Sequence, residues 1–226
     1  MIKSFRNFFK NILIVLIAIL YITFLYTDIS EKKLFLSSNI MKFISIFLCF
    51  LLAIVNHKSR KYKLNSKLLI TGLFFTLIAD YLFLIYNNFF PVAIGSFCIV
   101  QILYILRYNK QNIRKNILYI IFSLLIIFIV YGYIYNSIKK IDLILPIGLF
   151  YSSCLFISLK EAIYQYRYEL FPSPNKEMIL LGMILFVLCD INVAIYNTIG
   201  KTSDIASIAM WLFYLPSQLL LALSGN

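Results

Sequence analysis

The chain has 226 residues, of which 62% are hydrophobic and only 13% are charged. Soluble domains carry about 25% charged residues, so this composition excludes a soluble globular protein. The apolar residues stand in long blocks separated by short polar clusters, and blocks of about 20 apolar residues cross a bilayer as helices. We therefore predict an all-α polytopic membrane protein that forms one integral membrane domain over residues 1–226.

Eight membrane-spanning helices are predicted along the chain. The first follows three basic residues and no small-residue cleavage site comes after it, so we expect a retained helix and not a cleaved signal peptide. The loops between the spans are too short to form a domain. The predicted spans are 11–27, 37–56, 67–86, 90–106, 116–136, 143–159, 177–196 and 205–223.

The net charge of +12 could indicate a nucleic-acid partner, but its distribution favours a membrane topology. With a cytoplasmic N-terminus, 15 of the 21 Lys and Arg residues fall at the N-terminus and in the loops after the second, fourth and sixth spans. This bias follows the positive-inside rule and predicts that both termini are cytoplasmic. We therefore expect no nucleic-acid partner. The bias toward Ile, Lys, Asn and Tyr also favours a bacterial cell membrane as the location.

The cysteines and the single histidine do not form a metal-binding pattern. Cys49, Cys98, Cys154 and Cys189 all lie in apolar blocks, no two form a Cys-x-x-Cys pair, and no histidine is near them. Such cysteines usually pack as small apolar side chains. His57 lies in a basic loop and is expected to be solvated. We predict no metal site, no disulfide and no cofactor.

Two stretches repeat one polar pattern inside predicted spans: GLFFTLIADYLFLIYN at residues 72–87 and GMILFVLCDINVAIYN at residues 182–197. Each has a glycine eight residues before an aspartate and a Tyr-Asn pair six and seven residues after it. Of the nine acidic residues, only Asp80 and Asp190 fall inside the predicted spans, and the other seven lie in loops or at span edges. An ionisable group in the hydrocarbon is costly and often marks a function, although a structural hydrogen bond between helices is the alternative.

The two aspartates are expected to lie at similar depth and to share one cavity. Each follows a lysine at the basic end of its span by 13 or 14 residues, which corresponds to about 20 Å along parallel helices. Asn87 and Asn197 each follow an aspartate by seven residues and would share its helix face. The constant offset of 110 residues suggests an internal repeat of four spans.

Two glycines and six further polar residues complete the candidate site. Gly72 and Gly182 would let neighbouring helices approach closely. Lys42, near the outer start of the second span, could contact a phosphate or extend its amine to the interface. The other candidates are Gln101 and Tyr104 in the fourth span, Tyr151 after Pro146 in the sixth, and Tyr214 and Gln218 in the eighth.

These residues occur in motifs that resemble the YhhN-like family of membrane proteins, in the family's order and over nearly the whole chain. The family pattern GLxFSLxGDxxL resembles GLFFTLIAD at residues 72–80, and a later G-x-x-x-F-x-x-S-D resembles GMILFVLCD at residues 182–190. A span with F-x-x-x-H-x-x-Y resembles FCIVQILY at residues 97–104, and Y-x-x-x-Q resembles YLPSQ at residues 214–218. A Lys-Pro pair and a Pro-then-Tyr pattern resemble Lys42-Phe43 and Pro146 with Tyr151.

Four positions depart from the family pattern. Ala79 replaces a glycine, Phe43 a proline and Cys189 a serine. Gln101 replaces a histidine, and this is the most consequential change if that histidine takes part in chemistry or binding. Both aspartates are kept.

The resemblance implies a lysoplasmalogenase, the activity of the animal members of the family. Such an enzyme cleaves the vinyl ether bond of a lysoplasmalogen to a fatty aldehyde and a glycerophospho-alcohol, so the expected partners are a lysophospholipid substrate and the bilayer. Protonation of the double bond gives an oxocarbenium ion that water attacks, which requires one acid and one base. Two carboxylates can fill these roles, as in glycosidases, and Asp80 and Asp190 are the expected catalytic pair.

Two other functions stay open on the sequence alone. Carboxylates within the membrane and parallel repeats are features of secondary transporters, so a proton-coupled transporter of a small molecule or lipid could use the same aspartates. Loss of the family histidine at Gln101 also fits a structural or lipid-sensing protein without turnover. The oligomeric state, the headgroup and the chain length of the substrate are left open.

Overall fold

The computed structural model is a bundle of eight long α-helices and describes residues 2–30, 36–56, 63–109, 112–138, 143–199 and 204–225. The described residues form no strand, and eight of their helices are long and apolar enough to cross a membrane, as predicted. The elements are α1 (Ile2–Ser30), α2 (Ser38–Asn56), α3 (Lys63–Asp80), the π-helix η2 (Tyr81–Tyr86), α4 (Phe90–Tyr108), α5 (Ile113–Ile138), α6 (Ile144–Arg167), α7 (Asn175–Ile199) and α8 (Asp204–Leu223).

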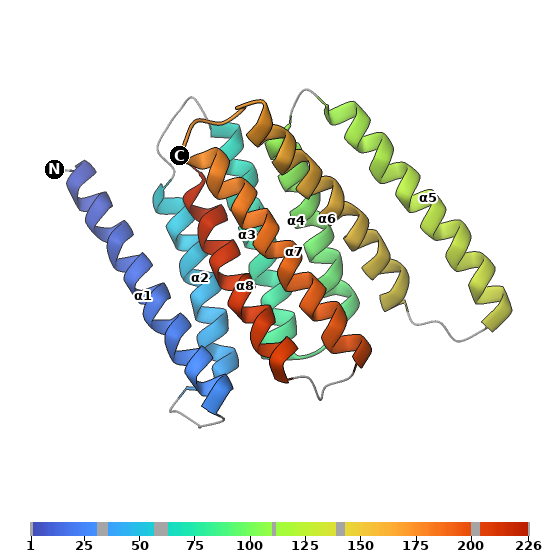
Figure 1. Cartoon of the computed structure of the whole chain (residues 1–226), viewed down its shortest axis with the longest axis horizontal. Helices are drawn as coiled ribbons and strands as arrows, with labels where there is room; N and C mark the ends of the chain where they lie inside the picture. The colour runs from blue at the N-terminus through green and yellow to red at the C-terminus, as the bar shows by residue number, and fades with distance from the viewer. Residues whose placement is uncertain are drawn as a thin grey trace.

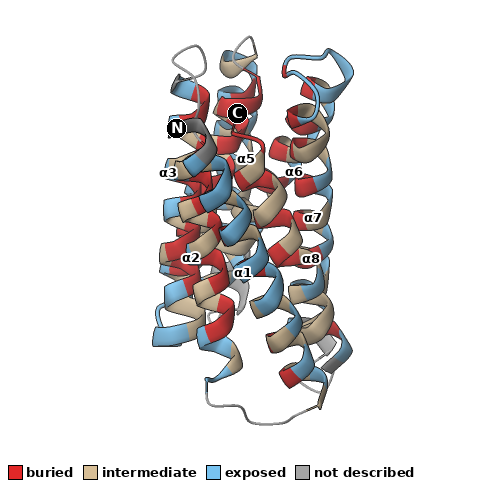
Figure 2. Ribbon diagram, turned by 90° about the vertical axis from the view of Figure 1, so that its left-hand side faces the viewer, coloured by how far each residue is buried: buried red, intermediate tan, exposed pale blue. Residues whose placement is uncertain are grey.

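The helices run alternately up and down, so both ends of the chain lie at one end of the bundle (Figure 1). We call this the terminal end and the opposite one the distal end. The closest helix pairs are α7 with α8, α3 with α4 and α4 with α6. The outer helices are α1, which packs on α2 and α8, and α5, which packs on α6 and α4. Buried residues lie mainly on the inward sides of the helices (Figure 2).

Two glycines set the close approach of the tightest helix pairs, as the sequence predicted. A Cβ atom on Gly72 of α3 would lie 2.8 Å from Cε1 of Tyr104 on α4. A Cβ atom on Gly182 of α7 would lie 2.9 Å from Cγ of Leu221 on α8. The Ser217 hydroxyl donates a hydrogen bond of 2.7 Å to the Gly182 carbonyl at the same crossing. Small residues and interhelical hydrogen bonds are the usual means of packing helices in lipid.

A proline inside α8 creates the attachment point for α1. Pro216 has no N–H to donate, so the carbonyl four residues earlier, on Leu212, lacks its helical partner. The Tyr21 hydroxyl of α1 donates a hydrogen bond of 2.9 Å to this Leu212 carbonyl. The proline is therefore tolerated because a side chain from another helix satisfies the free backbone group.

The third predicted span is not one regular helix. Its α-helical part ends at Asp80, and the π-helical turns of η2 follow to Tyr86. Bonding from i to i+5 widens the turn, so residues seven apart no longer share a face. Asn87 ends this segment in the left-handed region, with φ 50°. The prediction that Asn87 shares the helix face of Asp80 is therefore wrong.

The sequence also misplaced some charged residues. The sixth helix continues to Arg167, past the predicted end at 159, and so includes the buried Glu161. Asp28 lies in the last turns of α1, so Asp80 and Asp190 are not the only acidic residues within the helices that can span a membrane. Arg107, assigned to a loop by the sequence, is buried in α4.

The expected packing of the cysteines is confirmed. All four thiols are buried and free. His57, which was expected to be solvated, lies outside the described residues.

Candidate active site

Asp80 is a buried carboxylate held by a tyrosine from another helix. It is the last residue of α3, and only 4% of its surface is exposed. The Tyr214 hydroxyl of α8 donates a hydrogen bond of 2.8 Å to Asp80 Oδ2. Within the described residues, no basic side chain forms an ion pair with this carboxylate. The acid thus has one strong donor and no compensating cation.

Asp190 has the same kind of partner on different helices. It lies in α7 and is half-buried, and the Tyr151 hydroxyl of α6 donates a hydrogen bond of 2.5 Å to its Oδ2. Again, the part of the chain that the structure describes offers it no ion pair. The molecule therefore contains two Asp–Tyr pairs, each joining two helices.

The two pairs belong to one centre. The ring of Phe97 on α4 lies 6.0 Å from the ring of Tyr151 and 6.4 Å from that of Tyr214, measured between centroids. Cys189, next to Asp190 in the chain, lies close enough to both carboxylates to interact with them electrostatically. We call the two aspartates, their two tyrosines and Phe97 the Asp–Tyr centre. It gathers side chains from α3, α4, α6, α7 and α8.

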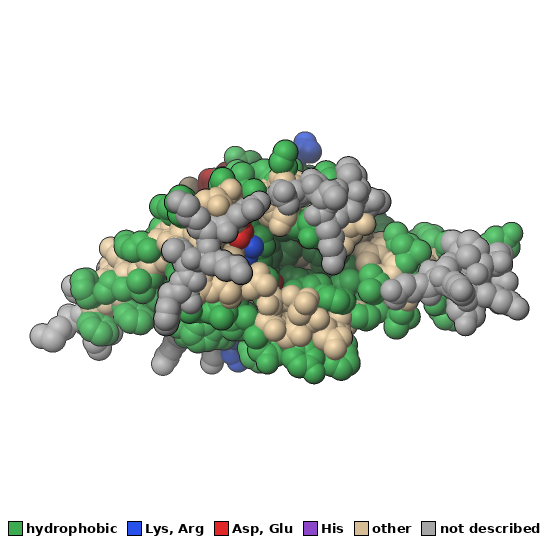
Figure 3. Space-filling model, turned by 90° about the horizontal axis from the view of Figure 1, so that it is seen from below, with side chains coloured by type: hydrophobic (Ala, Val, Ile, Leu, Met, Phe, Trp, Pro, Cys, Tyr) green, Lys and Arg blue, Asp and Glu red, His purple; other side chains and the backbone are tan. Residues whose placement is uncertain are grey.

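A hollow opens into the bundle from its distal end. Figure 3 looks at that end and shows a deep central depression whose walls are hydrophobic side chains, with a basic and an acidic side chain next to each other at its edge. At this end α1 finishes and α2 begins, and there Lys42 and Asp28 form an ion pair with 2.8 Å between Nζ and Oδ2. An apolar depression with a polar end suits an amphiphile that has one hydrocarbon chain.

Two buried glutamines near the centre have free hydrogen-bonding capacity. Gln101 on α4 is fully buried and close to the Tyr151 hydroxyl, yet no hydrogen bond of ordinary geometry reaches its amide from the described residues. Gln218 on α8, one turn after Tyr214, is equally buried, and its amide also has no partner in the described structure. Buried amides are normally hydrogen-bonded, so such groups are available for a ligand or water.

Three predicted site residues lie away from the aspartates. Tyr104 stacks on Tyr108 with 5.8 Å between ring centroids, and it lies beside Arg107 toward the terminal end. Asn197 is exposed, and its side chain donates to the Val193 carbonyl of its own helix. Asn87 is exposed beyond the end of η2. The helix face that Asn87 was expected to share with Asp80 therefore does not form, whereas Asn197 follows Asp190 on the uninterrupted helix α7 but is exposed.

Sequence reasoning missed several residues of the site. Phe97 was noticed only as part of a family motif, although its ring links the two tyrosines. Trp211 packs edge-on against Tyr214 with ring centroids 5.2 Å apart. It is the single tryptophan of the chain and comes three residues before Tyr214, so helical spacing could have identified it. Asp28 was missed because the first span was ended at residue 27, three residues before the end of α1.

Comparison with known proteins identifies one family. The model of the YhhN family matches residues 37–225, which runs from the residue before α2 through the end of α8 and includes the whole Asp–Tyr centre. The match leaves out α1, with its Asp28. No curated protein and no solved structure matches the chain.

Proposed function

Because the chain belongs to the YhhN family, we propose that it hydrolyses the vinyl ether bond of lysoplasmalogens and that Asp80 and Asp190 are its acid/base pair. The observation that carries the proposal is the Asp–Tyr centre. Two carboxyl groups without cationic partners among the described residues are each held by a tyrosine, and both tyrosine rings lie near Phe97, in a bundle whose distal end is hollowed and apolar. Carboxyl groups in a dry setting can be held in different protonation states, which acid/base chemistry requires.

The reaction consumes one water molecule and needs one proton donor and one proton acceptor. A carboxylic acid gives its proton to the β-carbon of the vinyl ether, and the electron pair of the ether oxygen forms an oxocarbenium ion. Water adds to this cation while the second carboxylate takes a proton from it. The resulting hemiacetal then releases the aldehyde: the second carboxyl returns its proton to the departing alcohol oxygen, and the hydroxyl proton goes back to the first carboxylate.

The difference in burial between the two carboxyl groups supports one assignment of their roles. Asp80 is the more deeply buried of the two, and among described residues only its Oδ2 is hydrogen-bonded, so Oδ1 can carry the proton that is donated. Asp190 is half-buried and therefore easier for water to reach, so it activates the water and stabilises the cation. Tyr214 and Tyr151 fix the two carboxyl groups in position by holding one oxygen of each.

The test is aldehyde release by the purified full chain from a 1-alkenyl lysophosphoethanolamine in detergent. We expect release from the wild type and a loss of about 10²–10⁴-fold in Asp80→Asn and in Asp190→Asn, the usual contribution of a general acid or base. Asparagine has the shape of aspartate, so both variants should keep the wild-type melting temperature. Glu169→Gln makes the same chemical change on an exposed carboxylate between α6 and α7 and should keep full activity.

Either of two results would overturn the proposal. One is normal aldehyde release from a folded single variant. The other is no release from a folded wild type with ethanolamine and choline headgroups both tried. The second result would favour a proton-coupled transporter. Measuring the pH dependence of solute or lipid uptake into vesicles that contain the protein would then test that function.

The assignment of roles has its own test. Formate can replace a missing carboxylate only where small solutes reach the site. We expect formate, which is ionised near neutral pH, to restore more of the activity of Asp190→Ala, which lacks the base, than of Asp80→Ala, which lacks the acid. Restoration of Asp80→Ala alone would reverse the two roles.

A further inference from the structure

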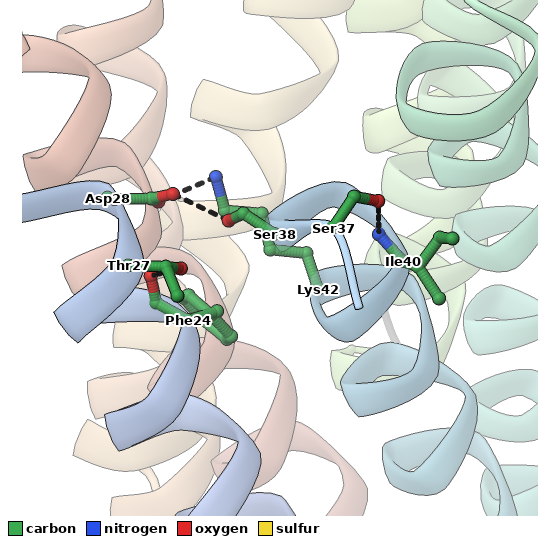
Figure 4. Close-up of polar contacts among 7 residues, drawn as sticks. All are labelled: Phe24, Thr27, Asp28, Ser37, Ser38, Ile40 and Lys42. Carbon is green, nitrogen blue, oxygen red and sulfur yellow. Dashed lines mark hydrogen bonds and ion pairs between the residues drawn. The ribbon is translucent and has the colours of Figure 1, made fainter. Parts of the chain in front are cut away.

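A buried ion pair closes the distal end of the helix pair α1–α2. Lys42 lies in the second turn of α2, and its ammonium is 2.8 Å from Asp28 Oδ2 in the last turns of α1 (Figure 4). The Ser38 hydroxyl donates a hydrogen bond of 2.5 Å to the other oxygen of Asp28. The Lys42 side chain is 7% exposed and that of Asp28 is 17% exposed. The carboxylate is therefore the more accessible member of the pair.

Aromatic rings hold the lysine in place and connect it to the Asp–Tyr centre. The ammonium of Lys42 lies 5.0 Å from the ring centroid of Trp211 and 5.8 Å from that of Phe24. Trp211 packs on Tyr214, which donates to Asp80. The ion pair is thus two ring contacts away from one of the proposed catalytic carboxylates.

This arrangement differs from that of a lysine that only avoids the membrane. Lysines near the end of a spanning helix usually extend their amine into water. Lys42 instead turns inward, under two rings. Taking two charges out of water is costly, so a buried ion pair is weak evidence of a stabilising role. A pair with separated charges of both signs is, however, complementary to a ligand that also carries both.

We propose that Lys42 and Asp28 together bind a zwitterionic phospholipid headgroup, with Lys42 donating to the phosphate and Asp28 accepting from the ammonium. The inference rests on the proposed function, because it places the headgroup end of that substrate. It adds that Asp28 selects against anionic headgroups, because these carry no ammonium that could pair with its carboxylate. The residue that selects lies on α1, outside the segment that the family model matches.

The hydrocarbon chain and the headgroup then occupy different parts of the distal end. The charged pair holds the headgroup, and the apolar walls of the hollow accept the chain (Figure 3). The bond between them, next to the glycerol, comes near Trp211 and Tyr214 and so near Asp80. The headgroup pair would therefore set the depth at which the vinyl ether stops.

The test measures binding of lipids that cannot react, so it does not depend on turnover. The ligands are 1-O-alkyl lysophospholipids without the vinyl double bond, one with a phosphoethanolamine and one with an anionic phosphoglycerol headgroup. The readout is the fluorescence of Trp211, the only tryptophan of the chain and a direct neighbour of Lys42. We expect the wild type in a neutral detergent to bind the zwitterionic lipid at least about tenfold more tightly, because only its ammonium can pair with the Asp28 carboxylate.

Variants then separate selection from simple structural support. Asp28→Asn should bind the zwitterionic lipid more weakly and the anionic lipid more tightly, whereas Asp28→Glu should keep the wild-type preference. If the ion pair only supported the structure, Asp28→Asn would lower the affinities for both lipids together. Glu169→Gln is the matched control, because Glu169 also pairs with a lysine, Lys176, but at the terminal end.

Equal affinity of the wild type for the two lipids would overturn the inference, and this measurement needs no variant to fold. Asp28→Asn with an unchanged ratio of affinities would overturn it as well. The binding ligands are not hydrolysed, so the two proposals can fail separately. A headgroup preference without aldehyde release in the activity assay would contradict only the proposed function. Aldehyde release without a headgroup preference would sink only this inference.

Discussion

Two of the levels at which the described part of the bundle buries ionisable groups are built differently. Near the terminal end, Arg107 is only 1% exposed and donates three hydrogen bonds within the described residues. One goes to Asn65 Oδ1 at 2.7 Å, and two go to the carbonyl and hydroxyl of Ser224 at 2.7 and 2.8 Å. We call these three residues the terminal polar layer. In the Asp–Tyr centre, by contrast, each carboxylate accepts one side-chain hydrogen bond.

We propose that this difference separates ionisable groups with a structural role from those with a chemical role. A buried charge with several hydrogen bonds is stabilised and holds its helices together, here α3, α4 and the end of α8. A buried carboxyl with one donor keeps an oxygen free to exchange a proton. The hollow also opens at the distal end, toward the Asp–Tyr centre (Figure 3). Ionisable groups within a membrane usually mark a function. Of the two kinds, only the carboxyl groups of the Asp–Tyr centre combine access from the hollow with an oxygen that is free to exchange a proton.

The largest expected effect is on stability, in Arg107→Met. The substitution removes three charge-assisted hydrogen bonds and leaves Asn65 and Ser224 without their partner. We expect a loss of about 3–5 kcal/mol in the free energy of unfolding, because each buried polar group left unsatisfied costs about 1–3 kcal/mol and Arg107 serves more than one. Thermal melting in detergent measures this loss. Aldehyde release per folded molecule should remain at the wild-type level.

Arg107→Lys is the matched variant for that comparison. Lysine keeps the charge but cannot reproduce the planar fork of the guanidinium, so an intermediate loss is expected. A stable but inactive Arg107→Met protein would contradict the distinction between the two levels.

In the Asp–Tyr centre we expect a smaller effect, and we expect it on the turnover rate and not on stability. Tyr151→Phe and Tyr214→Phe each remove one hydrogen bond to a carboxylate. Hydrogen bonds to charged groups are worth about 1.5–3 kcal/mol, so each variant should turn over about 10- to 100-fold more slowly if that bond acts in the transition state. Initial rates at saturating substrate measure the effect. Tyr104→Phe, in a tyrosine that lies beside Arg107, is the control and should keep its rate.

The sequence predicted the helices well because burial in lipid leaves few alternatives. Every backbone polar group must be satisfied internally, so each long apolar block becomes a helix. The sequence-based prediction of helix ends was wrong where a helix contains charged residues. The sixth span was ended before Lys160 and Glu161, but α6 continues because Glu161 is buried and accepts a hydrogen bond of 2.7 Å from the Asn109 side chain. A composition window cannot foresee such a partner.

The candidate site was predicted in part, and the error lies in the assumed repeat. The shared spacing identified Asp80 and Asp190, and Tyr151, Tyr214 and Gln101 were predicted to lie with them. A strict offset of 110 residues, however, would make Tyr104 the counterpart of Tyr214. In the structure Asp190 is held by Tyr151 from α6, and Tyr104 lies with Arg107. The two stretches are similar, but the helices around them are not.

Periodicity also could not reveal the π-helical turns after Asp80. The face assigned to Asn87 depended on an uninterrupted α-helix, and η2 removes that condition. The ion pair between Asp28 and Lys42 was out of reach for a different reason. It joins the end of one span to the start of the next, where the boundaries of predicted helices are least certain.

The smallest expected effect is that of replacing Gln101. This substitution tests whether an unsatisfied buried amide lowers stability but contributes to substrate binding. Both atoms of its buried amide lack a hydrogen-bond partner in the described residues. Gln101→Leu removes this unsatisfied amide and should leave stability unchanged or raise it by about 1 kcal/mol. If the amide contacts the substrate, KM should rise several-fold while kcat changes little, because the aspartates and tyrosines are intact. Gln165→Leu is the control in α6, where the side-chain amide donates to the Lys176 carbonyl. It should lose stability and keep KM. A Gln101→Leu protein that melts at a lower temperature would show that the amide is satisfied after all, and that the substitution of glutamine for the family histidine serves packing and not the substrate.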